Sequence, residues 1–416
     1  MQRTDRLFEL VQTMRDGRLH RAADLAADLG GVSVRTIWRD MATLIASGMP
    51  IEGERGVFDR WQTIGLTNDM LSFNEVTVDV GDDGAEADFY RVIRPGELFT
   101  VMLNGRPRLS GRSEVLESPI TPEGTRVRWI IRTRFADAWY CSADPSVSVE
   151  KTTIKAFVLA QYAKLGYTES DFIFAAGADA DLMTGVAKSG AKIDTDFLTI
   201  KVDAAKPQPT ESVRNAVERH LKRFHLAHWE GPDGKILVGR PSDDVDPRYN
   251  LTCRRGPESV RNNVTRATPK QDWSQVPSEL WVYGQSTGKD IAGAAIKGVS
   301  KDDELLEVYG RNRQFYRPVV LQNSEAKDLK EAETMARRER SARSKDKDAF
   351  SVQADGWSWW SDAGEQIPYA TNTVAFVDVF NRDPGNYLVT QTQSIMSIDQ
   401  RATTTLTLVA KGIWVV

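Results

Sequence analysis

The periodicity of the apolar residues changes at Trp61, and that change limits the folds the chain can adopt. Before Trp61 the apolar residues recur every three or four positions, as they do on one face of an α-helix. After it, short segments alternate apolar with polar residues and are rich in β-branched side chains, which is typical of half-buried strands. The sequence therefore predicts an α+β chain that is mainly β.

The residues before Trp61 follow the order helix, helix, turn, helix, hairpin. Gly30 and Gly31 are expected to make the turn, and Ser33 is expected to cap a third helix that runs to about Ser47. This order is that of a winged helix-turn-helix, which we assign to residues 1–60. The second helix is expected to bury four residues: Ala22, Leu25, Ala26 and Leu29.

The third helix is the candidate DNA-reading element. Its start points polar side chains outward, where a recognition helix meets base edges and phosphates. The candidate DNA-binding residues are Ser33, Arg35, Thr36 and Arg39. The apolar stripe on the other side is Val34, Ile37, Met41 and Leu44. Acidic residues balance the arginines of this segment, and the whole chain carries a net charge of −4, so attraction to DNA requires the cations to share one face.

Three stretches of this segment resemble the DeoR- and YafY-like winged helix regulators. They read GRLHRAADLAADLG, SVRTIWRDMATL and GMPIEGERGV. The resemblance covers residues 1–58 and implies double-stranded DNA as a partner.

The strand-rich remainder divides into three predicted domains. Residues 61–145 and 246–416 are expected to consist mainly of strands, and residues 146–245 to mix helices with strands. A charged helix is expected at 325–347, most simply as a solvated surface element. Residues 59–69, DRWQTIGLTND, are expected to be a short connection from the N-terminal domain.

Two motifs have the look of catalytic sites without the required partners. GQSTG at 284–288 has the form of a nucleophile elbow around Ser286, but all four histidines precede it, whereas the catalytic base should follow. On a helix His220 and His225 point about 140° apart, so they and His228 are expected on a polar face and not around a metal. We therefore expect no enzyme activity, no catalytic residue, no cofactor and no metal.

The remaining features are structural. Trp357 and Trp359 are expected on one face of a strand, with Trp360 opposite, in a barrel wall or a subunit contact. Cys141 and Cys253 are expected as free thiols. Neither a signal peptide nor an apolar segment of spanning length is found, so membrane insertion is not expected.

From about residue 70 onward the chain resembles the baseplate hub family of contractile-tail phages (Mu-like tail protein P, or late-control D). The stretches that carry it include LKRFHLAHWEGPDGKILVGRP, YRPVVLQNSEAKDLKEAETMARRERSAR and the terminal GWSWWSDAGEQIPYATNTVAFVDVF. The resemblance implies two tube-like β-barrel domains, part of the first at 61–145 and the second at 246–416, with an α/β insertion at 146–245. It further implies a homotrimeric ring that joins the tail tube to the central spike.

Two functions therefore follow from the sequence. In the first, the chain is a structural baseplate hub component of a phage or prophage tail, assembled in the host bacterial cytoplasm, which carries a DNA-binding head. In the second, it is a DeoR/YafY-like transcription regulator that binds DNA through residues 33–39 and senses a ligand or partner through residues 70–416.

Overall fold

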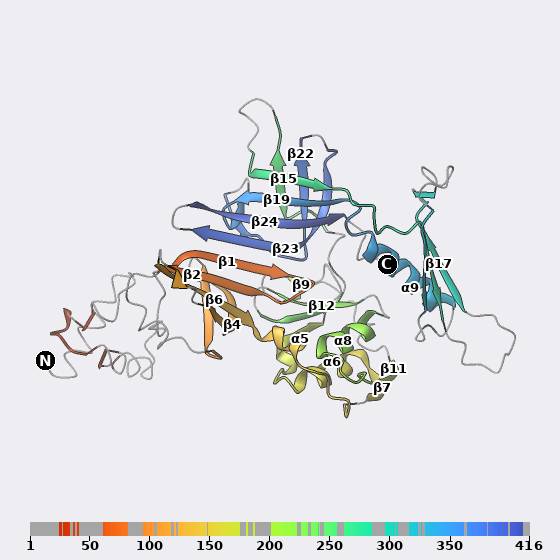
Figure 1. Ribbon diagram of the computed structural model, residues 1–416, viewed down its shortest axis with the longest axis horizontal. Coiled ribbons are helices and arrows are strands. Elements are labelled where there is room, and N and C mark those ends of the chain that lie inside the picture. The colour runs from red at the N-terminus through yellow and green to blue at the C-terminus, as the bar shows by residue number, and fades with distance from the viewer. Residues whose placement is uncertain are drawn as a thin grey trace. The chain divides into compact units, whose positions relative to one another are not determined.

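The computed structural model describes two parts of the chain (Figure 1). Near the N-terminus these are residues 25, 26, 28–33, 36, 37 and 40. Beyond it they are residues 61–410 without 82–94, 104–105, 118–119, 122–123, 148, 175–179, 182–185, 188–200, 223–225, 232–233, 240, 242–244, 256–261, 285–295, 304, 307–315, 323–325, 327–328, 362–363, 381 and 398–399. The chain divides into two compact units, Met1–Asp59 and Arg60–Val416.

The first unit contains the predicted turn between two helical segments. Gly30 and Gly31 have φ angles of 86° and 72°, a backbone conformation that glycine adopts without steric cost. Of the predicted inward residues, Leu25, Ala26, Leu29 and Ile37 are buried. The predicted wing hairpin lies outside the described residues.

The second unit is built around a twelve-stranded sheet (Figure 1). Its strands along the main path are, in order, β15 (Val264–Lys270), β19 (Ala349–Asp355), β24 (Gln400–Ala410), β23 (Gly385–Ser397), β1 (Trp61–Asp69), β2 (Glu75–Gly81), β6 (Gly124–Thr133), β4 (Arg106–Glu117) and β3 (Leu98–Leu103). A branch leaves β23 through β22 (Thr373–Val379) to β14 (Tyr249–Cys253), and β5 (Ile120–Thr121) pairs with β6.

Strand β1 occupies the middle of this sheet. It pairs antiparallel with β2 on one side and with β23 on the other. The expectation of a connection is therefore wrong for residues 61–69. Because Leu66 is buried and the flanking residues are half-buried, the segment is a sheet strand that joins the two strand-rich regions into one sheet.

One face of the sheet packs into apolar cores, as the alternation predicted. In the part formed by residues 249–410, Tyr249, Phe350 and Leu406 lie in a single buried cluster with Val352, Val377, Val389 and Leu408. The two predicted barrels are not closed among the described strands, since the ladder runs as an open path from β3 to β15.

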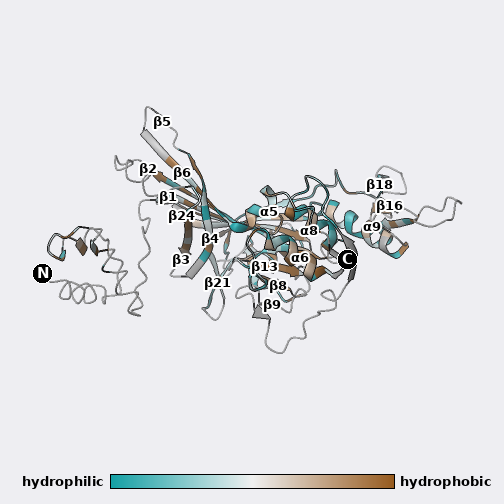
Figure 2. Ribbon diagram, turned by 90° about the horizontal axis from the view of Figure 1, so that it is seen from below, coloured by the Kyte–Doolittle hydropathy of each residue, from teal (hydrophilic) through white to brown (hydrophobic). Residues whose placement is uncertain are grey.

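The predicted α/β region has its own core. Two helices, α6 (Ile154–Ala163) and α8 (Val213–Lys222), bury apolar faces against strands β12 (Ala227–Glu230), β13 (Ile236–Gly239) and β8 (Phe172–Phe174), of which β8 and β13 are brown in Figure 2. The same region holds η1 (Arg134–Ala136), α5 (Asp137–Tyr140), η2 (Glu169–Asp171), the paired β7 (Val149–Thr153) and β11 (Lys201–Ala205), and the paired β9 (Ala180–Asp181) and β10 (Val186–Ala187).

A second small module lies within residues 279–343. Strands β17 (Lys297–Lys301), β16 (Glu279–Tyr283) and β18 (Pro318–Gln322) form a sheet that is covered by helix α9 (Leu329–Arg343). The predicted charged helix therefore exists, but its description as a solvated element is wrong for one face. Ala332, Met335 and Ala336 of α9 are buried against Leu280 and Val282.

The remaining described pair of strands is the hairpin β20 (Ser358–Trp360) and β21 (Gln366–Pro368). In the described part of the chain, no helix has the length and apolar character needed to cross a lipid bilayer. The domain boundaries at 145/146 and 245/246 stay predictions.

Candidate functional site: a polar sheet face and its ion-pair chain

A continuous row of side chains crosses nine strands on one face of the sheet. Each member lies directly opposite the next in the strand register, so all share that face. From β3 to β15 the row reads Leu98, Arg112, Arg132, Glu75, Thr67, Gln393, Thr405, Gln353 and Arg266. Eight of these nine residues are polar, and each is at least partly exposed.

A neighbouring row confirms the common face through side-chain hydrogen bonds. Gln391 donates from Nε2 to Oδ2 of Asp69 at 3.0 Å and accepts at Oε1 from Thr407 Oγ1 at 3.3 Å. One residue further along each strand, Leu66, Thr404 and Leu406 are buried on the opposite face. In the middle of the sheet, on β1, β23 and β24, this face is therefore mostly partly exposed and the opposite face is buried.

The middle of the polar face is built mainly of hydroxyl and amide side chains. On β1, β23 and β24 it carries Thr63, Thr67, Gln391, Gln393, Thr403, Thr405 and Thr407. Charged residues are concentrated towards the two ends of the row. Neutral hydroxyls and amides hydrogen-bond water without attracting ions strongly, so this middle zone can lie against solvent.

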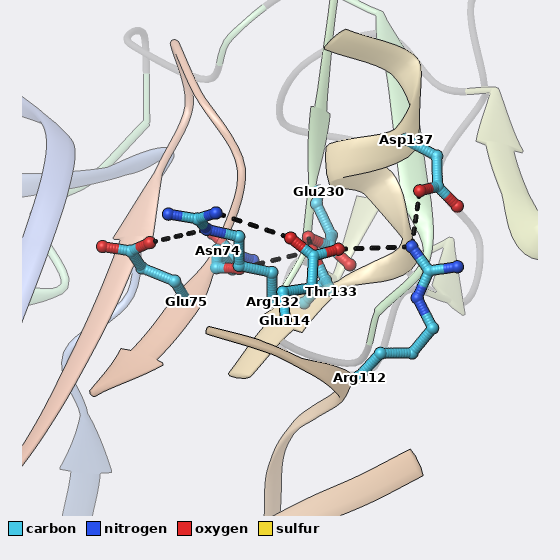
Figure 3. Close-up of polar contacts among 8 residues, drawn as sticks. All are labelled: Asn74, Glu75, Arg112, Glu114, Arg132, Thr133, Asp137 and Glu230. Carbon is cyan, nitrogen blue, oxygen red and sulfur yellow. Dashed lines mark hydrogen bonds and ion pairs between the residues drawn. The ribbon is translucent and has the colours of Figure 1, made fainter. Parts of the chain in front are cut away.

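At the β4 end the polar face becomes a chain of alternating charges (Figure 3). Arg132 contacts Glu75 at 3.2 Å and Glu114 at 3.5 Å, and Glu114 contacts Arg112 at 3.3 Å. Arg112 also donates to Asp137 Oδ1 at 2.5 Å, a hydrogen bond that raises the pKa of Arg112 above its ordinary value. The chain therefore reaches from β2 to the first residue of α5.

A second contact ties the sheet to the α/β region (Figure 3). Thr133, at the end of β6, donates from Oγ1 to Glu230 Oε2 of β12 at 2.6 Å, and its backbone N–H donates to Asn74 O at 3.2 Å. Both Thr133 and Glu230 are buried. Buried polar groups hold their partners in one geometry because breaking the contact leaves an unpaired group out of water.

Sequence reasoning did not find this face, although part of the signal was present. The alternation in EVTVDV and TTTLTLV marks a polar side on each strand separately. Which polar sides join depends on the registers between β1 and β23 and between β2 and β6, and these pairings link residues far apart in sequence.

The candidate DNA-binding residues are described in part. The backbone N–H of Thr36 donates to Ser33 Oγ at 3.2 Å, and the two hydroxyls lie 2.9 Å apart, so Ser33 caps the third helix as predicted. Arg35 and Arg39 lie outside the described residues. Asp40 is buried on the same side as Ile37.

The expectation of a polar histidine face is wrong. His220 and His228 are buried, and His225 lies outside the described residues. His228 Nε2 lies 2.8 Å from the Tyr162 hydroxyl, and His220 packs edge-on to Phe157 at 4.7 Å between ring centroids. Burial lowers the pKa of His228 to about 3, and nearby Arg214 adds to the shift, so this imidazole is neutral.

Among the described residues, no three His, Cys, Asp or Glu side chains come together as a possible metal site. Ser286 lies outside the described residues. In the tryptophan cluster, Trp359 packs half-buried against Tyr249 at 6.4 Å between ring centroids, whereas Trp360 is largely exposed.

Comparisons with known proteins give a result for each unit of the chain. Residues 6–57 match the family model of the HTH domain. The structure is similar to the 43 kDa tail protein of prophage MuSo2 from Shewanella oneidensis, with a TM-score of 0.66, 17% sequence identity, and coverage of 86% of this chain and 96% of that chain. It is also similar to a tail protein from Neisseria meningitidis MC58, with a TM-score of 0.65, 18% identity, and coverage of 85% and 94%.

This chain has the fold of these two tail proteins. It is a mainly β fold, preceded by an HTH domain. A search of curated proteins by sequence gives no match.

Proposed function

We propose that this chain is a structural hub component of a contractile phage or prophage tail, with an HTH head. The observation that carries the proposal is the likeness of fold, which extends over 96% and 94% of the two tail proteins. The described polar contacts support a structural role. The Thr133–Glu230 and Arg112–Asp137 hydrogen bonds join the large sheet to the α/β region.

A homotrimeric ring is supported by the two open ends of the sheet. Strand β3 ends the path on one side and β15 on the other. On β3, Leu98 is 80% exposed and Met102 is 44% exposed, and among the described strands β4 is its one partner. An apolar edge strand is a site for pairing with another chain. Identical copies joined head to tail, β3 to β15, form a ring when the rotation between neighbours closes.

The polar face supports an adaptor role for that ring. In a sheet continued from copy to copy, the row from Arg112 to Arg266 extends around the assembly as one polar surface. A hydrated surface with a mainly neutral middle suits the wall of a passage between tube and spike. We propose the tail tube and the spike as the partners above and below, and the virion baseplate, assembled in the host cytoplasm, as the location.

Multi-angle light scattering on the full chain and on residues 60–416 tests this proposal. We expect three copies in both cases, and co-purification with tube and spike proteins when these are expressed together. A stable monomer at micromolar concentration contradicts the ring. A trimer that forms only when residues 1–59 are present contradicts the role of the sheet in assembly.

A transcription regulator is the second candidate, favoured by the HTH match over residues 6–57 and by the capped start of the third helix. Salt-sensitive binding to DNA upstream of its own gene, lost in Arg35→Ala/Arg39→Ala, supports it. The matched control is Arg254→Ala/Arg255→Ala, which removes two arginines from the second unit. Binding that is equal in both double variants contradicts readout by residues 33–39.

A further inference from the structure

Strand β14 lies at an edge of the sheet, because β22 is its one partner among the described strands. The backbone groups on its other side are nevertheless occupied. Two successive asparagines that precede β15, Asn262 and Asn263, lie along this edge.

Asn263 makes three hydrogen bonds to the edge. Its side chain accepts from Thr252 N at 2.8 Å and donates to Asn250 O at 2.6 Å, and its own backbone N–H donates to Thr252 O at 3.2 Å. Asn262 makes a reciprocal pair of hydrogen bonds with Arg254, which lies two residues after Thr252. Arg254 N donates to Asn262 Oδ1, and Asn262 Nδ2 donates to Arg254 O, both at 2.9 Å.

The two side-chain amides therefore stand where a neighbouring strand would stand. A side-chain amide offers a carbonyl acceptor and N–H donors, the same kinds of group that a peptide offers, so two amides can satisfy alternate residues of a strand. The carbonyl of Asn250 and both backbone groups of Thr252 and Arg254 are bonded within the chain, which opposes the approach of an incoming strand.

Strand β3, at another edge of the sheet, is apolar and exposed. Its sequence, LFTVML, contains no charged residue, and Leu98 and Met102 are exposed. The sheet thus has one edge that is capped by side chains, at β14, and one edge, at β3, on which no second strand pairs among the described residues.

We propose that Asn262 and Asn263 direct assembly: by capping β14 they prevent it from pairing with a second copy of this chain, and they leave β3 and β15 as the pairing edges. This inference rests on the proposed ring. It adds the residues that decide which of the sheet edges take part.

The test compares wild type with Asn262→Ala/Asn263→Ala, with Asn263→Asp as a milder variant and with Asn386→Ala, an exposed asparagine of β23, as the control. Hydrogen exchange measures the protection of the β14 backbone amides, and light scattering measures the mass of the assembly. In the double variant we expect the amides of Thr252 and Arg254 to exchange at least about tenfold faster while Leu251 and Val377 remain protected.

We also expect the double variant to form species larger than those of wild type, increasing with concentration, while the control keeps the wild-type mass. Asn263→Asp keeps the acceptor for Thr252 N but loses the donor to Asn250 O. Its exchange rates and its mass are therefore expected to lie between those of wild type and those of the double variant. Faster exchange with an unchanged mass overturns the inference, as does unchanged exchange.

The outcome is separate from that of the proposed function. The wild-type mass decides whether a trimer forms. The difference between variant and wild type decides whether the asparagines restrain pairing, whatever the wild-type mass is.

Discussion

Thr67 of β1 lies opposite Gln393 of β23 on one side and opposite Glu75 of β2 on the other. Strand β1 (Trp61–Asp69) thus joins strands from the early part of the chain to strands from the late part, and we call it the seam of the sheet. Removing a central strand exposes both neighbouring ladders and the apolar residues beneath them, so the seam should dominate the cooperativity of unfolding.

The seam predicts different outcomes for two truncations. A chain of residues 60–416 keeps β1 and should melt in one cooperative transition near that of the full chain. A chain of residues 70–416 lacks β1, so its sheet should divide and melt broadly at lower temperature. Circular dichroism melting curves distinguish them. Equal transitions for both truncated chains would show that β1 is dispensable.

Gly298 is predicted to be essential for the packing of α9 on β17. A Cβ atom at this position would lie 2.1 Å from the backbone carbon of Ala332, so the helix would have to move. Gly298→Ala should lower the free energy of unfolding by about 3 kcal/mol, as overpacking does. Gly65→Ala is the matched control, because the nearest atom to its new Cβ is at 4.0 Å. Urea denaturation measures both, and similar losses would refute the close-contact explanation.

Thr210 is predicted to be strained. Its φ is 67°, in the left-handed region that β-branched residues avoid, within a turn closed by Glu211 N to Gln208 O at 3.1 Å. Thr210→Asn should raise the free energy of unfolding by about 1 kcal/mol, because asparagine tolerates this conformation. Thr268→Asn, on exposed β15, should give no gain. Destabilisation by Thr210→Asn would mean that the threonine side chain has compensating contacts.

Protonation of His228 in the unfolded state is expected to lower the free energy of unfolding in acid. Its pKa is about 3 in the folded chain and near 6.5 when unfolded, so between these values the unfolded state binds one more proton. The stabilising effect of the neutral imidazole is therefore complete above pH 6.5 and declines as the pH falls towards 3, by about 1.4 kcal/mol per pH unit. His228→Gln keeps a partner for Tyr162 and should reduce that slope between pH 4 and 6. An unchanged slope would contradict the assignment.

Ser33 is predicted to stabilise the third helix as its N-cap. Ser33→Ala removes the acceptor of the Thr36 N–H and should cost about 1 kcal/mol in the first unit, whereas Ser33→Asp should retain most of it. Thermal melts of a fragment of residues 1–59, which is a compact unit of the structure, measure the difference. Equal losses in both variants would indicate that the hydroxyl acts in another way.

Local sequence patterns were sufficient for most elements and insufficient for their partners. Within residues 146–245, where helices and strands are expected together, helices α6 and α8 and the hairpin of β12 and β13 are present, and each depends on contacts close in sequence. The turn at Gly30 and the cap at Ser33 are confirmed for the same reason.

The interpretations that proved wrong depended on distant contacts. Residues 61–69 contain Thr, Gly, Asn and Asp, which suggested a connection, and pairing with β23 makes them a strand. The many charged residues of α9 obscured its buried alanines, Ala332 and Ala336, of which Ala332 lies in close contact with Gly298. His228 is polar by type but is enclosed by Phe135 and Tyr162.

The central place of β1 also sets the order in which the protein can be completed during synthesis. The ribosome delivers β1 before any other strand of the sheet, and β2 follows within a few residues. The second partner of β1, β23, emerges after more than three hundred further residues. One edge of β1 must therefore stay unpaired through nearly the whole of translation, a period in which an exposed strand edge is open to association with other chains.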